Sequence, residues 1–221
     1  MQDLRLNGVV ITLQAVVEVP NVQGTPVPWP VAPLAPLSWL VLNGECVSDQ
    51  VGLFVAALVV HVERPAGAGP AETVDALLAE ESLIVSGGLR VMDTDTGMAV
   101  TPGCCSGLED WRHWSELLSG ESPWMGHDPA PRVEFLDDRL RVWQDDHLTA
   151  VRQQAEAHVD LPQSIVPTLL DEVQRDLVDF LGALDAWSRR IVPDSRAQAL
   201  ARAVDRSLAV SGPLALPGGR G

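Results

Sequence analysis

The chain has 221 residues, of which 46% are hydrophobic and 20% charged, a balance typical of a folded protein rather than a disordered one. Its 30 acidic side chains outnumber 15 cations, all of them Arg, so the formal net charge at pH 7 is −15. This charge argues against nucleic acid and anionic membranes as partners, because both bind basic surfaces. The lack of Lys excludes Schiff-base chemistry and Lys-dependent phosphate loops.

The N-terminal part of the chain predicts β-structure. Apolar and polar residues alternate from Val9 to Val19, after the dipeptide Asn7-Gly8, which is typical of a tight hairpin turn. Six prolines over residues 20–36 are incompatible with a helix interior or a central strand, so we expect an extended connection. A second Asn-Gly pair, Asn43-Gly44, predicts a hairpin that leads into residues 45–48.

The middle of the chain predicts strands and two helices. Residues 52–62 are apolar at nearly every position, which predicts a central strand buried on both faces, with a buried helix as the alternative. Helices are expected over 71–81 and 107–118, the second begun by a capping box of Ser106 and Glu109. Short strands are expected over residues 83–85, 89–92 and 98–101, with a polar turn over residues 93–97.

Residues 132–143 predict a hairpin that turns at Asp137-Asp138. Cross-strand pairs are then chemically favourable: Val133 with Val142, Phe135 with Leu140, Glu134 with Arg141 and Arg132 with Trp143. Beyond it, apolar residues recur at helical spacing from Ile165 to Ile191, Pro193 ends that helix, and a second helix follows. We expect these two helices to pack as an antiparallel pair on the sheet.

Together these elements predict an α+β protein with a mainly antiparallel sheet, two crossing helices and a C-terminal antiparallel helical pair. The expected organisation is a sheet domain over 1–148, a helical segment packed on it over 149–211, and a flexible tail over 212–221. The longest apolar run, over 51–60, is about half of the roughly 20 residues that a membrane span needs. Without a signal peptide or a disulfide framework of Cys residues, we expect a cytoplasmic protein.

The negative charge is concentrated in residues 71–160, which hold 18 acids against 6 Arg. The same stretch holds the reactive side chains. Cys104 and Cys105 directly precede a predicted helix, whose N-terminus favours a thiolate. His113 or His127 would then be the base, and Asp110 or Asp128 would orient it. Buried, inert Cys at a strand–helix junction is the alternative interpretation.

Cys104, Cys105, His113 and His127 have side chains that can bind a metal. Adjacent Cys form an awkward chelate, and neither C-x₂-C nor H-x₃-H spacing occurs, so the spacing predicts no metal site and no cofactor.

Residues 122–131 form a Pro-stiffened loop that carries Trp124 and Met125, which either anchor a partner or fold onto the core beside Trp111 and Trp114. The core alternative is favoured, because large aromatic side chains are mostly buried.

Two functional hypotheses follow. The first is a non-enzymatic acidic binding protein, of an immunity or regulatory type, that engages a basic protein partner through residues 71–160. Its binding residues are expected to be Glu109, Asp110, Trp124, Met125, His127 and Asp128. The alternative is a small cysteine-dependent enzyme that uses Cys104 or Cys105 with His113 or His127, and Asp128 as the orienting group.

Overall fold

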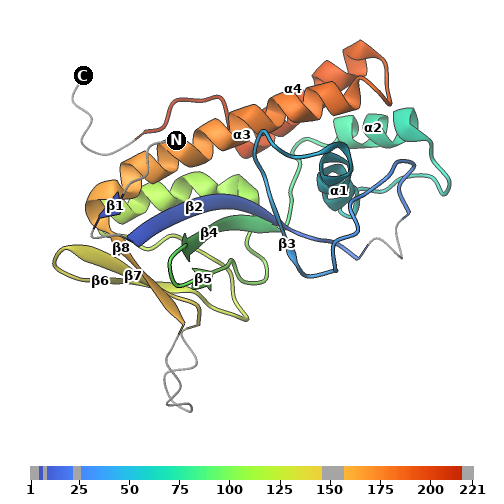
Figure 1. Ribbon diagram of the computed structural model, residues 1–221. Helices are drawn as coiled ribbons and strands as arrows, with labels where there is room; N and C mark the ends of the chain where they lie inside the picture. Colours follow the sequence, from blue (N-terminus) through green and yellow to red (C-terminus); the bar gives the residue numbers. More distant parts are fainter. Residues whose placement is uncertain (1–4, 7–8, 22–25, 146–156, 216–221) are drawn as a thin grey trace.

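The computed structural model describes residues 5–6, 9–21, 26–145 and 157–215 (Figure 1). In chain order the elements are β1 (Arg5–Leu6), β2 (Val9–Glu18), β3 (Trp39–Val41), α1 (Ser48–Val59), α2 (Pro70–Ala79), β4 (Gly87–Asp93), β5 (Ala99–Val100), the 3₁₀ helix η2 (Leu108–Ser119), β6 (Arg132–Phe135), β7 (Arg139–Trp143), β8 (His158–Pro162), the 3₁₀ turn η4 (Gln163–Ile165), α3 (Val166–Ser188) and α4 (Asp194–Leu208). The α+β class is confirmed. The Asn7-Gly8 turn lies outside the described residues.

Within the described residues the strands form two antiparallel sheets. The first has the order β1-β2-β4-β5, with β3 also paired to β2, and the second has the order β6-β7-β8. Strand β2 is central, because it pairs with β1, β3 and β4. Its pairing with β4 runs from Ile11 opposite Asp93 to Val17 opposite Gly87. Its side chains alternate between buried and half-buried from Ile11 to Ala15, as the sequence pattern predicts.

Helices cover one side of the first sheet. In Figure 1, α3 and η2 lie on the same side of β2, and α4 packs against α3 as the predicted antiparallel partner. The second sheet lies at the lower left in this view, and β8 contacts both β4 and β5. No helix in the described part of the chain combines the length and the apolar character that a bilayer crossing requires.

The predicted central strand over 52–62 is wrong, because α1 occupies Ser48–Val59. Every residue from Val51 to Val59 is buried. A helix that is buried all round has no polar face, so its sequence shows no helical periodicity. Two aromatic side chains fix its position. Phe54 packs edge-to-face on Phe180 of α3, with 4.8 Å between the ring centroids. The Trp29 indole N–H donates a hydrogen bond to the Gly52 carbonyl oxygen at 2.9 Å.

The predicted hairpin at Asn43-Gly44 is also wrong. Strand β3 pairs with β2 instead, with Val41 opposite Val16. The Asn43 side chain accepts a hydrogen bond from the Glu45 backbone N–H at 2.9 Å, which turns the chain into α1 rather than into a second strand.

Residues 83–85 form no strand, and the Ser106–Glu109 capping box is not formed. The N-cap of η2 is Gly107, without a side-chain cap, and Glu109 instead accepts a hydrogen bond from the Val85 N–H at 3.5 Å. The element is a 3₁₀ helix because its apolar residues recur every third position, which suits three residues per turn. Its buried residues are Leu108, Trp111, Trp114 and Leu117.

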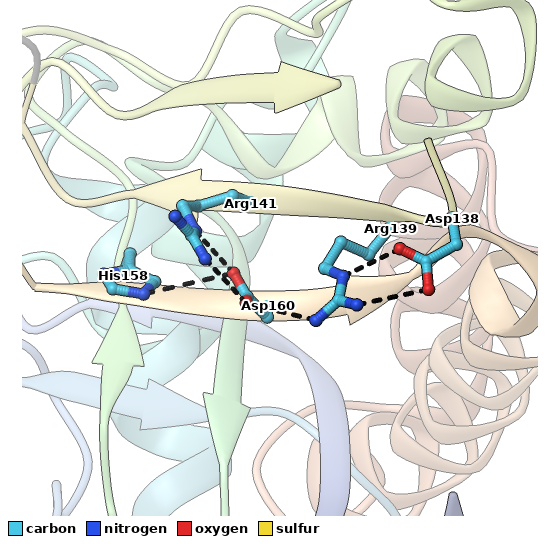
Figure 2. Close-up of polar contacts among 5 residues, drawn as sticks. All are labelled: Asp138, Arg139, Arg141, His158 and Asp160. Carbon is cyan, nitrogen blue, oxygen red and sulfur yellow. Dashed lines mark hydrogen bonds and ion pairs between the residues drawn. The ribbon is translucent and has the colours of Figure 1, made fainter. Parts of the chain in front are cut away.

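The hairpin over 132–143 is confirmed in every predicted pair, from Arg132 opposite Trp143 to Phe135 opposite Leu140. The Arg132 guanidinium lies 5.1 Å from the Trp143 ring centroid. The Arg141 side chain, however, turns toward β8, where it donates two hydrogen bonds to Asp160 at 2.7 and 2.9 Å (Figure 2). On this face Arg141 therefore pairs with Asp160, while Glu134 accepts a hydrogen bond from the Trp143 indole N–H at 3.1 Å.

Candidate functional site

Two loops that are distant in sequence pair through their backbones. The first follows β5 and carries Gly103 and Cys104, and the second joins η2 to β6 and carries Met125 and His127. The Gly103 N–H donates to the Met125 carbonyl at 2.7 Å. Cys104 and His127 exchange two hydrogen bonds, at 2.7 and 3.0 Å. This short ladder fixes the relative position of the two loops.

The ladder depends on two glycines. A Cβ on Gly103 would lie 2.0 Å from the Pro129 carbonyl oxygen, and one on Gly126 would lie 2.5 Å from the Gly103 carbonyl oxygen. Gly126 also adopts φ +94°, a left-handed conformation that glycine reaches without steric cost. Only residues without a side chain allow the two backbones to approach this closely.

The ladder brings three ionisable side chains together at the surface. Cys104 and Cys105 have their sulfur atoms 3.5 Å apart. These sulfurs and one ring nitrogen of His127 all lie within 4.8 Å of one another, and all three residues are exposed. The hydrogen bond between the two thiols, followed by the electrostatic effect of Cys105, raises the pKa of Cys104.

His127 has a carboxylate beside it. Its Nδ1 lies 3.2 Å from an Asp128 carboxylate oxygen. His113 is not part of this cluster, and its ring lies 3.7 Å from Asp110 instead. Of the two histidines proposed from sequence, the structure therefore places only His127 beside the thiols.

Trp124 lies on the same loop but points outward. Its neighbours Pro123 and Met125 are buried, whereas Trp124 itself is 58% exposed. It is the one exposed residue among the seven Trp, all of which are described. The expectation that Trp124 folds onto the core is therefore wrong, and Met125 is the residue that does so. Trp124 and Asp110 line one small cleft, and the His127 ring centroid lies 6.5 Å from that of Trp124.

We call Asp110, Trp124, His127 and Asp128 the Trp124 surface.

No protein-family model matches the chain, and no curated protein or solved structure matches it either. The chemistry of this surface therefore has to be derived from its own residues.

Among the described carboxylates of residues 71–160, two groups differ in their partners. Some are paired with Arg: Asp75 with Arg196, and Asp138 and Asp160 with the arginines of β7 (Figure 2). Hydrogen bonds from Arg141 hold the pKa of Asp160 below its ordinary value, and Arg139 does the same for Asp138. At the Trp124 surface, by contrast, Asp110 pairs with His113 and Asp128 pairs with His127, rather than with Arg.

Glu109 belongs to a different feature. Together with Cys104, Cys105 and Ile84 it lines an open groove of about 300 Å³. His61, in the turn after α1, also lines this groove. Sequence reasoning did not select His61, since nothing local to that turn links it to residues 104–109.

Proposed function

We propose that the chain is a non-enzymatic protein-binding module, of an immunity or regulatory type, that engages a basic protein partner through the Trp124 surface. The observation that carries the proposal is the exposure of Trp124 on the same surface as Asp110 and Asp128, two carboxylates that have no Arg partner among the described ion pairs. An exposed indole on a loop with buried neighbours is a common anchor of protein interfaces.

An Arg or Lys side chain fits this surface on physical grounds. A cation over the indole face gains about 0.5–1 kcal/mol when exposed and about 2 kcal/mol when desolvated. The adjacent carboxylates add attraction that speeds encounter and selects against acidic partners. Because Pro123 and Met125 are already buried, Trp124 loses little conformational freedom on binding.

The test is recovery of a basic protein from a native lysate by the tagged chain, followed by measurement of its affinity. We expect the partner to dissociate as salt rises, since the attraction is between surface charges. Trp124→Ala is expected to weaken binding by about 30-fold or more, as for an interface hot spot. Asp110→Asn and Asp128→Asn are expected to lower the association rate and its salt dependence.

Matched controls come from the same third of the chain. Phe135→Ala removes an exposed aromatic ring on β6, and Asp95→Asn removes an exposed carboxylate in the β4–β5 turn. Both should leave affinity unchanged. An acidic partner, or a partner whose affinity ignores both salt and Trp124→Ala, would reject the proposal.

A cysteine-dependent enzyme is the second candidate. The cluster of Cys104, Cys105 and His127, with Asp128 beside the imidazole, favours it. The raised pKa of Cys104 opposes it, because catalysis needs a thiolate at working pH. Alkylation of the native protein by iodoacetamide decides between them: fast reaction near pH 7 would support an activated nucleophile, and thiols inert below pH 8 would exclude one.

A further inference from the structure

We propose that Cys104, Cys105 and His127 form a binding site for a thiophilic divalent cation, with Zn²⁺ as the ion that fits best. Two sulfur donors and one imidazole nitrogen are the ligands that Zn²⁺ prefers. The site uses the Cys pair, which lies outside the Trp124 surface, and it shares His127 with that surface.

The spacing of the donors suits tetrahedral coordination. With Zn–S near 2.3 Å and Zn–N near 2.0–2.1 Å, tetrahedral geometry requires about 3.8 Å between two sulfurs and about 3.6 Å between a sulfur and the nitrogen. The Cys104 and Cys105 sulfurs are 3.5 Å apart, and the His127 nitrogen lies within 4.8 Å of both. Tetrahedral coordination therefore requires the His127 nitrogen to lie closer to the sulfurs than the 4.8 Å limit of the present cluster.

The backbone explains how adjacent Cys residues can serve as two ligands. Consecutive side chains of an extended chain point to opposite sides. Cys105 is in a left-handed conformation, with φ +62°, which a non-glycine residue rarely adopts. This conformation brings the two thiols to the same side, so the poor chelate expected from the sequence becomes a converging pair.

Asp128 acts as a positioning residue. Its carboxylate lies against Nδ1 of His127. Nε2 is then the ring nitrogen whose lone pair can bind the metal. Metal-binding His residues are commonly oriented in this way by a carboxylate. Three protein ligands leave a fourth position for water, which the groove beside the two Cys residues can supply.

The surrounding charge also favours a cation. Glu109 lines the groove next to the thiols, and the carboxylate of Glu18 acts electrostatically on Cys104. Zn²⁺ binds the thiolate form of Cys, so a bound metal must displace protons from the thiols. Binding is therefore expected to strengthen as pH rises.

The test is titration of the reduced, chelator-treated full chain with Co²⁺, followed by displacement with Zn²⁺. We expect one equivalent of Co²⁺ to give a thiolate-to-metal charge-transfer band and the intense visible bands of a tetrahedral site, and Zn²⁺ to remove both. Cys104→Ser, Cys105→Ser and His127→Gln should each weaken binding strongly. All three side chains are exposed, so thermal melts of these variants should stay close to that of the wild type.

Two variants serve as matched controls. Cys46→Ser removes the third thiol, which is half-buried and donates to the Val41 carbonyl, and His113→Gln removes the other histidine of the region. Both should bind Co²⁺ like the wild type, whereas Asp128→Asn should lower the affinity by about 10–100-fold. A wild type without the charge-transfer band would overturn the proposal. So would a spectrum that survives His127→Gln or disappears with Cys46→Ser.

Discussion

Gly103→Ala is expected to break the backbone ladder that assembles the site. The new Cβ would lie 2.0 Å from the Pro129 carbonyl oxygen and 2.8 Å from the backbone nitrogen of His127. Carbon–oxygen contacts are normally no shorter than about 3.3 Å, so the loops must separate by roughly 1.3 Å. Hydrogen bonds that now measure 2.7, 2.7 and 3.0 Å would then lengthen to about 4 Å, which is beyond bonding distance.

The loss of three backbone hydrogen bonds sets the size of the effect. At about 1 kcal/mol each, the free energy of unfolding should fall by about 3 kcal/mol. For a chain of this length, that corresponds to a decrease in Tm of about 6–12 °C. Calorimetry measures this change, and amide hydrogen exchange locates it: the N–H groups of Cys104 and His127 should lose their protection.

Gly182→Ala is the matched control for Gly103→Ala. Gly182 lies inside α3, and a Cβ there would meet nothing within 4 Å. Alanine in a helix interior should therefore stabilise the protein, by about 0.5–1 kcal/mol. The reasoning would be refuted if Gly103→Ala melted within a degree of the wild type and the amides of Cys104 and His127 stayed protected.

Three further substitutions test the fold. Phe54→Ala removes the edge-to-face contact with α3 and should lower the free energy of unfolding by about 3–5 kcal/mol, as measured by calorimetry. A decrease smaller than that caused by truncating an exposed Val to Ala would contradict the burial of α1. Arg112 donates to four carbonyls of residues 209–213, so Arg112→Ala should make this segment sensitive to proteases, and unchanged cleavage would refute its role. Asp160→Asn should lower Tm by about 2–4 °C at pH 7. Because the pKa of Asp160 is lowered by folding, its stabilisation is complete above about pH 4 and is lost as pH falls through the folded pKa, so melts of the two proteins should converge in acid.

The parts of the fold that could be predicted from sequence are those with one polar and one buried face. The β6–β7 register follows from cross-strand pairs, such as Val133 with Val142, that are favourable in one alignment only. Helix α3 follows from its apolar stripe. Helix α1 has neither signal, because all its residues from Val51 onward are buried. Its start was nevertheless visible in Ser48-Asp49-Gln50, since Gln50 accepts a hydrogen bond from the Val47 N–H.

The candidate site was only half predictable. The sequence places Cys104 and Cys105 in one loop, but the proximity of His127 results from backbone pairing between two loops, and no local pattern encodes such pairing. The spacing argument against a metal treats ligands as neighbours along the chain, whereas the ladder places His127 beside the Cys pair from a distant loop. Trp124 was misjudged because burial statistics for Trp ignore the local alternation, in which Pro123 and Met125 take the buried positions.

The loop that carries Trp124 and His127 contributes to both proposed sites, and this has a measurable consequence. His127 lies three residues after Trp124, and the ladder joins its backbone to Cys104. A metal that holds His127 would stiffen the loop, so partner binding at Trp124 would lose less entropy. Zn²⁺ should then tighten the partner, and by linkage the partner should tighten Zn²⁺ by the same factor. Titration of each ligand with and without the other measures that factor, and a value of one would show that the ladder is already rigid without metal.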